Sequence, residues 1–153
     1  MDDPTLNNSG SHPGPNHPEP SHPYGQEGAF VEWFDTPVVE AKEGPLSGLT
    51  FASKDMLVFK NRLPRCGLPQ APDLGLKGTA TILETLLAAG ARMAGLTCLT
   101  ALAYEPSGLK GDGTRPLNPW GRPLISGGSS SGSAVAVASQ QVDFAIGSDT
   151  AGS

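Results

Sequence analysis

The stretch that decides the fold is Gly127-Gly-Ser-Ser-Ser-Gly-Ser-Ala-Val-Ala-Val-Ala138, in which a loop of glycine and serine runs directly into a helix-forming segment. Glycines permit close backbone approach, and the N-terminus of the following helix presents unpaired N–H groups to an anion or an oxyanion. A phosphate-binding P-loop needs Gly-Lys-Ser or Gly-Lys-Thr, and the sequence contains neither triplet. A flexible linker is the alternative interpretation, but linkers are not followed by a well-patterned helix and strand.

Short hydrophobic segments surround this loop in the order of an α/β sheet. We expect strands at 49–53 and 142–146, helices at 79–91 and 131–139, a strand or the start of a short helix at 96–102, and a long loop at 106–128. The first helix should be capped by Thr79 or Thr81, bury a stripe of Ile82, Leu83, Leu86 and Leu87, and end at Gly90. Because the sequence stops just after a strand, and parallel sheets are normally covered on both faces, we expect residues 29–153 to be the N-terminal part of a longer α/β domain.

Net charge and the length of the apolar stretches argue against nucleic acid and membrane as partners. The 153 residues allow one domain, and 10 basic against 15 acidic residues give a net charge of −5. That balance excludes the basic surface needed for nucleic acid or an anionic membrane. No apolar stretch approaches the roughly 20 residues of a membrane span, and no basic segment precedes an apolar run at the N-terminus. We therefore expect a soluble cytoplasmic protein that binds neither nucleic acid nor membrane.

Two cysteines, Cys66 and Cys98, allow at most one disulfide and are too few for a structural zinc site. A reducing compartment fits this cysteine content best. Neither cysteine has a histidine partner in the domain, and we interpret both as structural residues.

The first 28 residues differ from the rest of the chain. They hold six prolines and all three histidines, and a His-Pro pair recurs every five residues from His12 to Pro23. Few of these residues could join a hydrophobic core, so the composition predicts a disordered tail at residues 1–28. Weak metal binding or a polyproline-type interaction site is the alternative for this repeat.

A serine nucleophile needs a base, and residues 24–153 contain no histidine. The sequence therefore argues against a Ser-His-Asp triad, and lysine remains as a base if burial lowers its pKa. Lys54 is the candidate because it ends one apolar segment and, after Asp55, precedes another at residues 56–59. A buried ion pair of Lys54 with Asp55 or another carboxylate is the alternative.

Three blocks of the sequence resemble the signature blocks of the amidase signature family: residues 44–55, 127–138 and 147–153. The resemblance covers residues 44–153, and Asn118-Pro119-Trp120 is similar to the segment that precedes the glycine loop in that family. Within the family, the blocks are most similar to plant-type indole-3-acetamide amidases. The implied fold is α/β, the N-terminal part of a mixed sheet covered by helices.

The resemblance also implies a mechanism, hydrolysis of a linear amide through an acyl-enzyme without metal or cofactor. By position, Ser153 would be the nucleophile, and Ser129, in a cis peptide, would relay its proton to Lys54. The oxyanion hole would be formed by the backbone N–H groups of Thr150, Ala151, Gly152 and Ser153. Ser130 and Asp149 would support the relay and the loop.

The sequence departs from the family pattern at three places. Ala151 replaces the first of the two glycines that usually precede the nucleophile, and a positive φ there would cost about 1 kcal/mol. The family's usual polar run is replaced by Leu-Thr-Cys-Leu-Thr-Ala-Leu-Ala at residues 96–103. The sequence also ends at Ser153, so we expect the isolated chain to be inactive or unstable. A non-catalytic truncated homologue, and an interaction protein acting through the His-Pro tail, are the alternatives.

Overall fold

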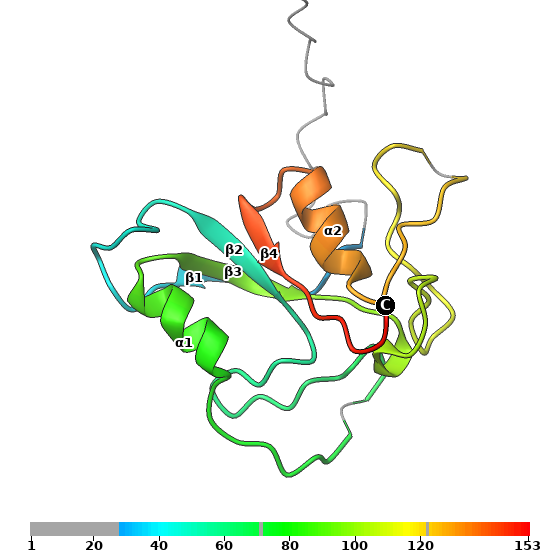
Figure 1. Ribbon diagram of the computed structural model, residues 1–153, viewed down its shortest axis with the longest axis horizontal. Helices are drawn as coiled ribbons and strands as arrows, with labels where there is room; N and C mark the ends of the chain where they lie inside the picture. The colour runs from blue at the N-terminus through cyan, green and yellow to red at the C-terminus, as the bar shows by residue number, and fades with distance from the viewer. Residues whose placement is uncertain (1–27, 71, 122) are drawn as a thin grey trace, which may run out of the picture.

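The computed structural model describes residues 28–70, 72–121 and 123–153, so the tail predicted at 1–28 lies almost wholly outside the described residues. The described chain forms a four-stranded mixed sheet with helices (Figure 1). The elements are β1 (Phe30–Val38), β2 (Thr50–Lys54), α1 (Thr81–Ala88), β3 (Arg92–Thr97), the 3₁₀ turn η1 (Ala101–Ala103), α2 (Ser131–Ala138) and β4 (Phe144–Ile146).

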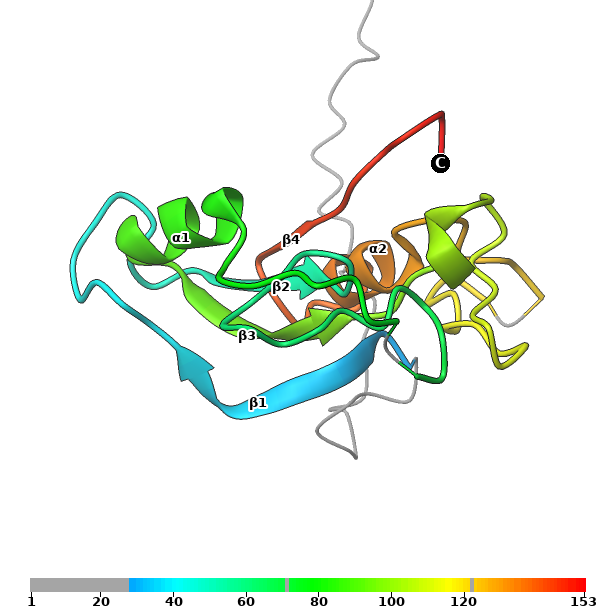
Figure 2. The ribbon, with the colours of Figure 1, turned by 90° about the horizontal axis from the view of Figure 1, so that it is seen from below.

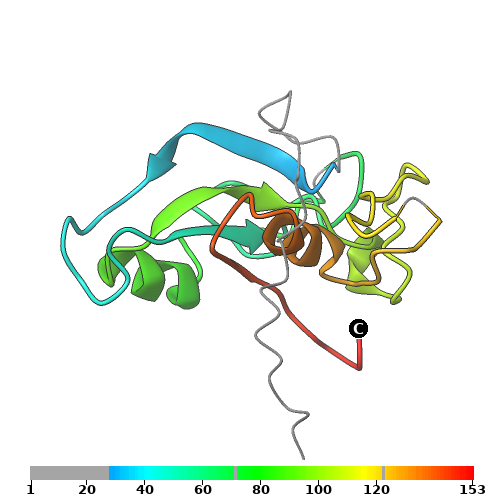
Figure 3. The ribbon, with the colours of Figure 1, turned by 90° about the horizontal axis from the view of Figure 1, so that it is seen from above.

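The strands lie in the order β1-β3-β2-β4, with β1 at one edge and β4 at the other (Figure 3). β1 runs antiparallel to β3, whereas β2 is parallel to both β3 and β4. Lys54 of β2 pairs with Thr97 of β3, and Ser53 pairs with Ile146 of β4. The carboxyl ends of these three strands therefore meet at one end of the sheet, which is where ligands bind in open α/β sheets.

Alternate residues of the strands build two separate cores. α1 covers one face of the sheet (Figure 2). Phe51 and Met93 point to this face and pack with Leu83 and Leu87 of the helix. Neighbouring small residues point to the other face and pack against α2; this second core contains Ala52, Ala94, Val135 and Ala136. Small side chains on both sides let α2 lie close to the strands, which brings its N-terminus to the carboxyl ends of β2 and β3.

Gly132 sets the closest approach of α2 to the sheet. Its N–H donates to the carbonyl of Cys98 at 3.0 Å, one residue beyond the end of β3. A Cβ at this position would overlap the backbone of both Ala29 and Cys98. The N-terminus of α2 is thereby fixed against the segments that follow β3 and precede β1.

The predicted strand at 49–53, the helix at 131–139 and the strand at 142–146 are confirmed within two residues at each end. The predicted α/β fold, a mixed sheet covered by helices, is confirmed as well. Residues 96–102, expected to form a strand or the start of a short helix, contain both the end of β3, which begins earlier at Arg92, and the start of a 3₁₀ turn at Ala101. β1 was not anticipated, because this edge strand includes Pro37 and lacks a regular alternation of buried and exposed residues.

The predicted start and stripe of α1 were partly wrong. Ala80 precedes the helix and makes no side-chain cap, while the Thr79 hydroxyl instead accepts a hydrogen bond from the Lys60 N–H at 3.0 Å. Ile82 is 45% exposed and lies outside the buried stripe. Gly90 ends the helical segment as expected, with φ +91°.

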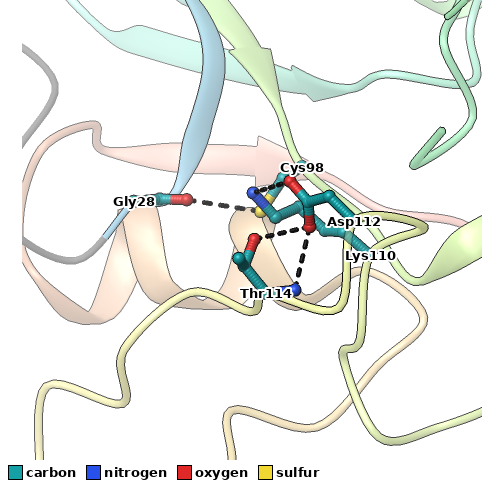
Figure 4. Close-up of polar contacts among 5 residues, drawn as sticks. All are labelled: Gly28, Cys98, Lys110, Asp112 and Thr114. Atoms are coloured by element: carbon teal, nitrogen blue, oxygen red, sulfur yellow. Dashed lines mark hydrogen bonds and ion pairs between the residues drawn. The ribbon is translucent and has the colours of Figure 1, made fainter. Parts of the chain in front are cut away.

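The loop between η1 and α2 is ordered by local polar contacts near the start of β1 (Figure 4). Asp112 accepts hydrogen bonds from the N–H and hydroxyl of Thr114 and pairs with Lys110 at 3.6 Å. The thiol of Cys98 donates to the carbonyl of Gly28 at 3.4 Å. Cys98 and Cys66 are both free and buried.

Helices in the described ranges are too short to cross a membrane, since α1 and α2 have eight residues each.

Candidate active site

Lys54 is the last residue of β2, and its side chain is fully buried. Two residues after Ala52, it points to the α2 face of the sheet. Its Nζ donates to the hydroxyl of Ser129 at 2.6 Å and to the carbonyl of Ser148 at 3.2 Å. Three segments far apart in the sequence thus meet at one buried amine.

Burial lowers the pKa of Lys54 below its ordinary value of 10.5, because the charged ammonium loses its hydration. The negative charge of Asp149 acts in the opposite direction and raises that pKa. The net shift favours the neutral amine, which is the form that can accept a proton.

Asp55 does not form the ion pair with Lys54 that the sequence left open. Its carboxylate accepts a hydrogen bond from the backbone N–H of Arg65 at 3.2 Å, and its own N–H donates to Thr97. Burial raises the pKa of Asp55 to about 6. The ion pairs of the described residues join Lys60 to Glu40, Arg62 to Glu32 and Lys110 to Asp112.

Ser129 lies in the loop that enters α2 and is 1% exposed. The peptide bond between Gly128 and Ser129 is cis. The carbonyl of Ser129 accepts a hydrogen bond from the N–H of Thr100 at 3.0 Å. A Cβ at Gly128 would lie 2.5 Å from the Thr100 hydroxyl oxygen, so glycine is required for this approach.

Two further serines fix the segment after β4 to the start of α2. The Ser130 hydroxyl accepts from the N–H of Ser148 at 3.1 Å and donates to the carbonyl of the same residue at 3.2 Å. The Ser133 hydroxyl donates to the carbonyl of Ile146 at 2.9 Å and lies 2.8 Å from the Thr97 hydroxyl. These contacts hold the Ser148 carbonyl where Lys54 reaches it.

Asp149 organises the last four residues. One of its carboxylate oxygens accepts the N–H groups of Gly152 at 2.6 Å and Ser153 at 3.1 Å. The Ser153 hydroxyl donates to the carbonyl of Ala103 at 3.3 Å, beside η1, where Figure 1 shows the chain ending. Two N–H groups expected in the oxyanion hole are thus directed at Asp149 in this structure.

Ala151 does not adopt the positive φ that would be strained for alanine in place of glycine. The positive φ of this loop falls on Gly152, at +91°, and Ala151 is absent from the described non-glycine residues with positive φ. The methyl group therefore does not meet the steric penalty expected for alanine in the left-handed region.

The predicted site residues meet in an open cleft of about 440 Å³. Its wall contains five of them: Ser129, Ser130, Asp149, Gly152 and Ser153. Lys54 lies beneath and reaches the cleft through its hydrogen bond to Ser129. Thr150 and Ala151 belong to the same loop but do not line the cleft.

Thr97, Thr100 and Ser148 take part in this arrangement and were not singled out from the sequence. Thr97 and Thr100 are buried polar residues in a segment whose surrounding letters are apolar. Buried hydroxyl groups need hydrogen-bond partners. Threonines within an apolar segment are therefore the feature of the sequence that could have indicated these two residues. Among the described residues, no three histidine, cysteine or acidic side chains gather as a metal site.

The fold and this arrangement place the chain in the class of amidase signature proteins. The chain belongs to the amidase family, whose model matches residues 34–153. It is 41% identical over 131 residues to Amidase 1 of Oryza sativa subsp. japonica, covering 84% of this chain and 30% of that protein. It is 40% identical over 130 residues to Amidase 1 of Arabidopsis thaliana, covering 82% and 31%.

A solved structure of the native peptide amidase from Stenotrophomonas maltophilia is similar in fold, with a TM-score of 0.58 and 31% identity. The superposition covers 67% of this chain and 22% of that one. The chain spans about 30% of the length of the two curated plant relatives.

Proposed function

We propose that this chain supplies the nucleophile, the proton relay and the base of an enzyme that hydrolyses carboxamides. The observation that carries the proposal is the 2.6 Å contact between the Lys54 amine and the Ser129 hydroxyl, made by a lysine that is fully buried. A surface lysine is protonated and cannot act as a base near neutral pH, whereas burial lowers the pKa of Lys54.

The reaction proceeds in two halves. The neutral Lys54 amine accepts the Ser129 proton, Ser129 takes the proton of Ser153, and Ser153 Oγ forms a bond to the amide carbon. The carbon–nitrogen bond then breaks, and the nitrogen leaves as ammonia after receiving the proton back through the same relay. Water attacks the resulting ester, which releases the carboxylic acid and restores Ser153.

Stabilisation of the oxyanion is assigned to the N–H groups of residues 150–153. For that role the N–H groups of Gly152 and Ser153 must turn from the Asp149 carboxylate toward the substrate. In this structure both N–H groups donate to Asp149 and are not available to an oxyanion. We therefore expect residues 1–153 alone to be inactive on amides. The proposed substrate is a linear small-molecule amide, and the proposal requires no metal or cofactor.

A non-catalytic family member is the second candidate. It is favoured by the contacts of Ser153, whose hydroxyl donates to Ala103 and whose N–H donates to Asp149. A function in protein interaction through the His-Pro repeat concerns residues outside the described part of the chain.

Ammonia release from primary amides tests the proposal, measured both on residues 1–153 and on the longest natural product that carries this sequence. We expect the longer product to be active, and Lys54→Met, Ser129→Ala and Ser153→Ala each to lower kcat at least a hundredfold. Intact-mass analysis during turnover should reveal an acyl adduct that Ser153→Ala abolishes. Activity that survives Ser153→Ala would contradict the mechanism, and a natural product that releases no ammonia from these amides would count against the proposal and favour the non-catalytic candidate.

A further inference from the structure

A polar cavity of about 180 Å³ lies on the face of the sheet opposite to the candidate active site. Val31 and Leu96 line it and belong to the side of the sheet that α1 covers, whereas Lys54 points to the α2 side. The N–H of Asp55 donates to Thr97 and so continues the pairing of β2 with β3. Because side chains alternate along a strand, Asp55 points away from Lys54 and toward this cavity. The cavity is therefore separate from the 440 Å³ cleft.

Four charged side chains line the cavity: Glu32, Asp55, Arg62 and Arg65. Arg62 and Glu32 form an ion pair with each other. The positive charge of Arg65 lies close enough to lower the pKa of Asp55, although burial raises that pKa more. Asp55 and Arg65 nevertheless form no ion pair with each other, so one negative and one positive side chain of the cavity wall remain unmatched.

Asp55 is 3% exposed, and one of its carboxylate oxygens accepts the backbone N–H of Arg65 at 3.2 Å. Its other oxygen accepts no hydrogen bond from any residue that the structure describes. The pKa of Asp55 is about 6, so the group is mostly ionised at pH 7.5. A buried carboxylate is unfavourable without donors, and an open oxygen at a cavity wall is therefore matched by a donor on an occupant.

The guanidinium of Arg65 makes no ion pair or side-chain hydrogen bond within the described ranges of the chain. A guanidinium presents several N–H donors in one plane, a geometry that matches a carboxylate. A simple anion in the cavity would be repelled by Asp55, and a simple cation would be repelled by Arg65. The occupant that matches both side chains carries one positive and one negative charge.

We propose that this cavity binds a small neutral α-amino acid as its zwitterion, with the ammonium group on the open oxygen of Asp55 and the carboxylate on the guanidinium of Arg65. Val31, Leu63 and Leu96 also line the cavity and would contact a small apolar side chain. This site is independent of the proposed amide hydrolysis, because it lies on the other face of the sheet and uses none of the proposed catalytic residues.

Ligand-detected NMR of L-alanine with residues 1–153 at pH 7.5 measures binding without catalysis. We expect saturable binding of alanine. Propanoate lacks the ammonium, ethylamine lacks the carboxylate, and propanamide is uncharged, so each should bind at least tenfold more weakly. The longest natural product that carries this sequence replaces the 153-residue chain if the latter fails to fold.

Two variants test the assigned contacts. Asp55→Asn keeps an acceptor for the Arg65 N–H but removes the charge, and Arg65→Met removes the guanidinium; each should weaken alanine binding at least tenfold. Asp35→Asn and Arg115→Met are the matched controls, because both positions are exposed and do not line the cavity. The inference is overturned if alanine gives no saturable binding, if any of the three analogues binds as tightly as alanine, or if either variant binds alanine as tightly as its control does.

Discussion

We predict that Asp55 makes the stability of the chain depend on pH in the direction opposite to that of ordinary acid denaturation. Its side chain is 3% exposed, and burial raises its pKa from 3.8 to about 6. Between these values the folded chain binds more protons than the unfolded chain. The free energy of unfolding contributed by Asp55 therefore falls as the pH rises through this window.

The magnitude follows from the shift. A difference of roughly two pKa units corresponds to about 3 kcal/mol of destabilisation once Asp55 is ionised in both states, above pH 6. Below pH 3.8 both states are protonated and the contribution vanishes. Asp55→Asn removes the titration while retaining an oxygen that can accept the Arg65 N–H.

Urea unfolding of residues 1–153 at pH 4, 5, 6 and 7, with and without Asp55→Asn, isolates the effect from other titrating groups. The stability of the variant relative to the original chain should increase by up to about 3 kcal/mol between pH 4 and pH 7. Asp35→Asn, at an exposed position in β1, controls for the loss of one negative charge. A relative stability that is constant across this range, or that decreases, would refute the assignment of burial as the dominant cause.

Three other predictions use the contacts around the site. Gly132→Ala should destabilise the chain by about 1–3 kcal/mol, although alanine favours a helix by about 1 kcal/mol over glycine, because the methyl group would overlap the backbone of Ala29 and Cys98; equal or greater stability in urea unfolding would contradict the close approach of α2. Thr100→Val should cost about 1–3 kcal/mol because the Gly108 N–H loses its acceptor, whereas Thr100→Ser, which keeps the hydroxyl, should cost about 1 kcal/mol; similar losses for both would show that the hydroxyl is unimportant. Burial raises the pKa of Cys98 to about 11, so its reaction with a disulfide reagent at pH 8 should be at least a hundredfold slower in the folded chain than in urea, and comparable rates would show that the thiol is accessible.

The sequence predicted well those elements that a local pattern of apolar and turn-forming residues identifies. Gly48 precedes the apolar segment that contains β2, and a glycine and serine loop leads into α2, so the local pattern agrees with the structure. β1 lacks that property because its pairing with β3 is made by residues about 60 positions later, and its own sequence contains charged residues and a proline. Pairing with a strand so distant in the sequence cannot be predicted from the local pattern of residues.

The residues of the candidate site likewise include some that local sequence could predict and some that it could not. Burial of Lys54 could be predicted from the apolar segments on either side, and a buried lysine is a candidate base because burial favours its neutral amine. Its partner Ser129 came from the resemblance, because no spacing rule connects a strand end with a loop that precedes a distant helix. Thr100 was missed because its importance lies in the close approach of Gly128, which exists only in the folded chain.

Asp149 contacts or faces both parts of the site on which the proposed chemistry depends. Its negative charge raises the pKa of Lys54, against the effect of burial, and its carboxylate accepts the N–H groups of Gly152 and Ser153. Both interactions oppose the proposed chemistry, since the first favours the protonated amine and the second occupies donors needed by the oxyanion. A rearrangement that moves this carboxylate away from both partners would favour neutral Lys54 and free the two donors together. In the proposed mechanism, the protonation state of Lys54 and the availability of the two N–H donors would therefore be coupled through Asp149.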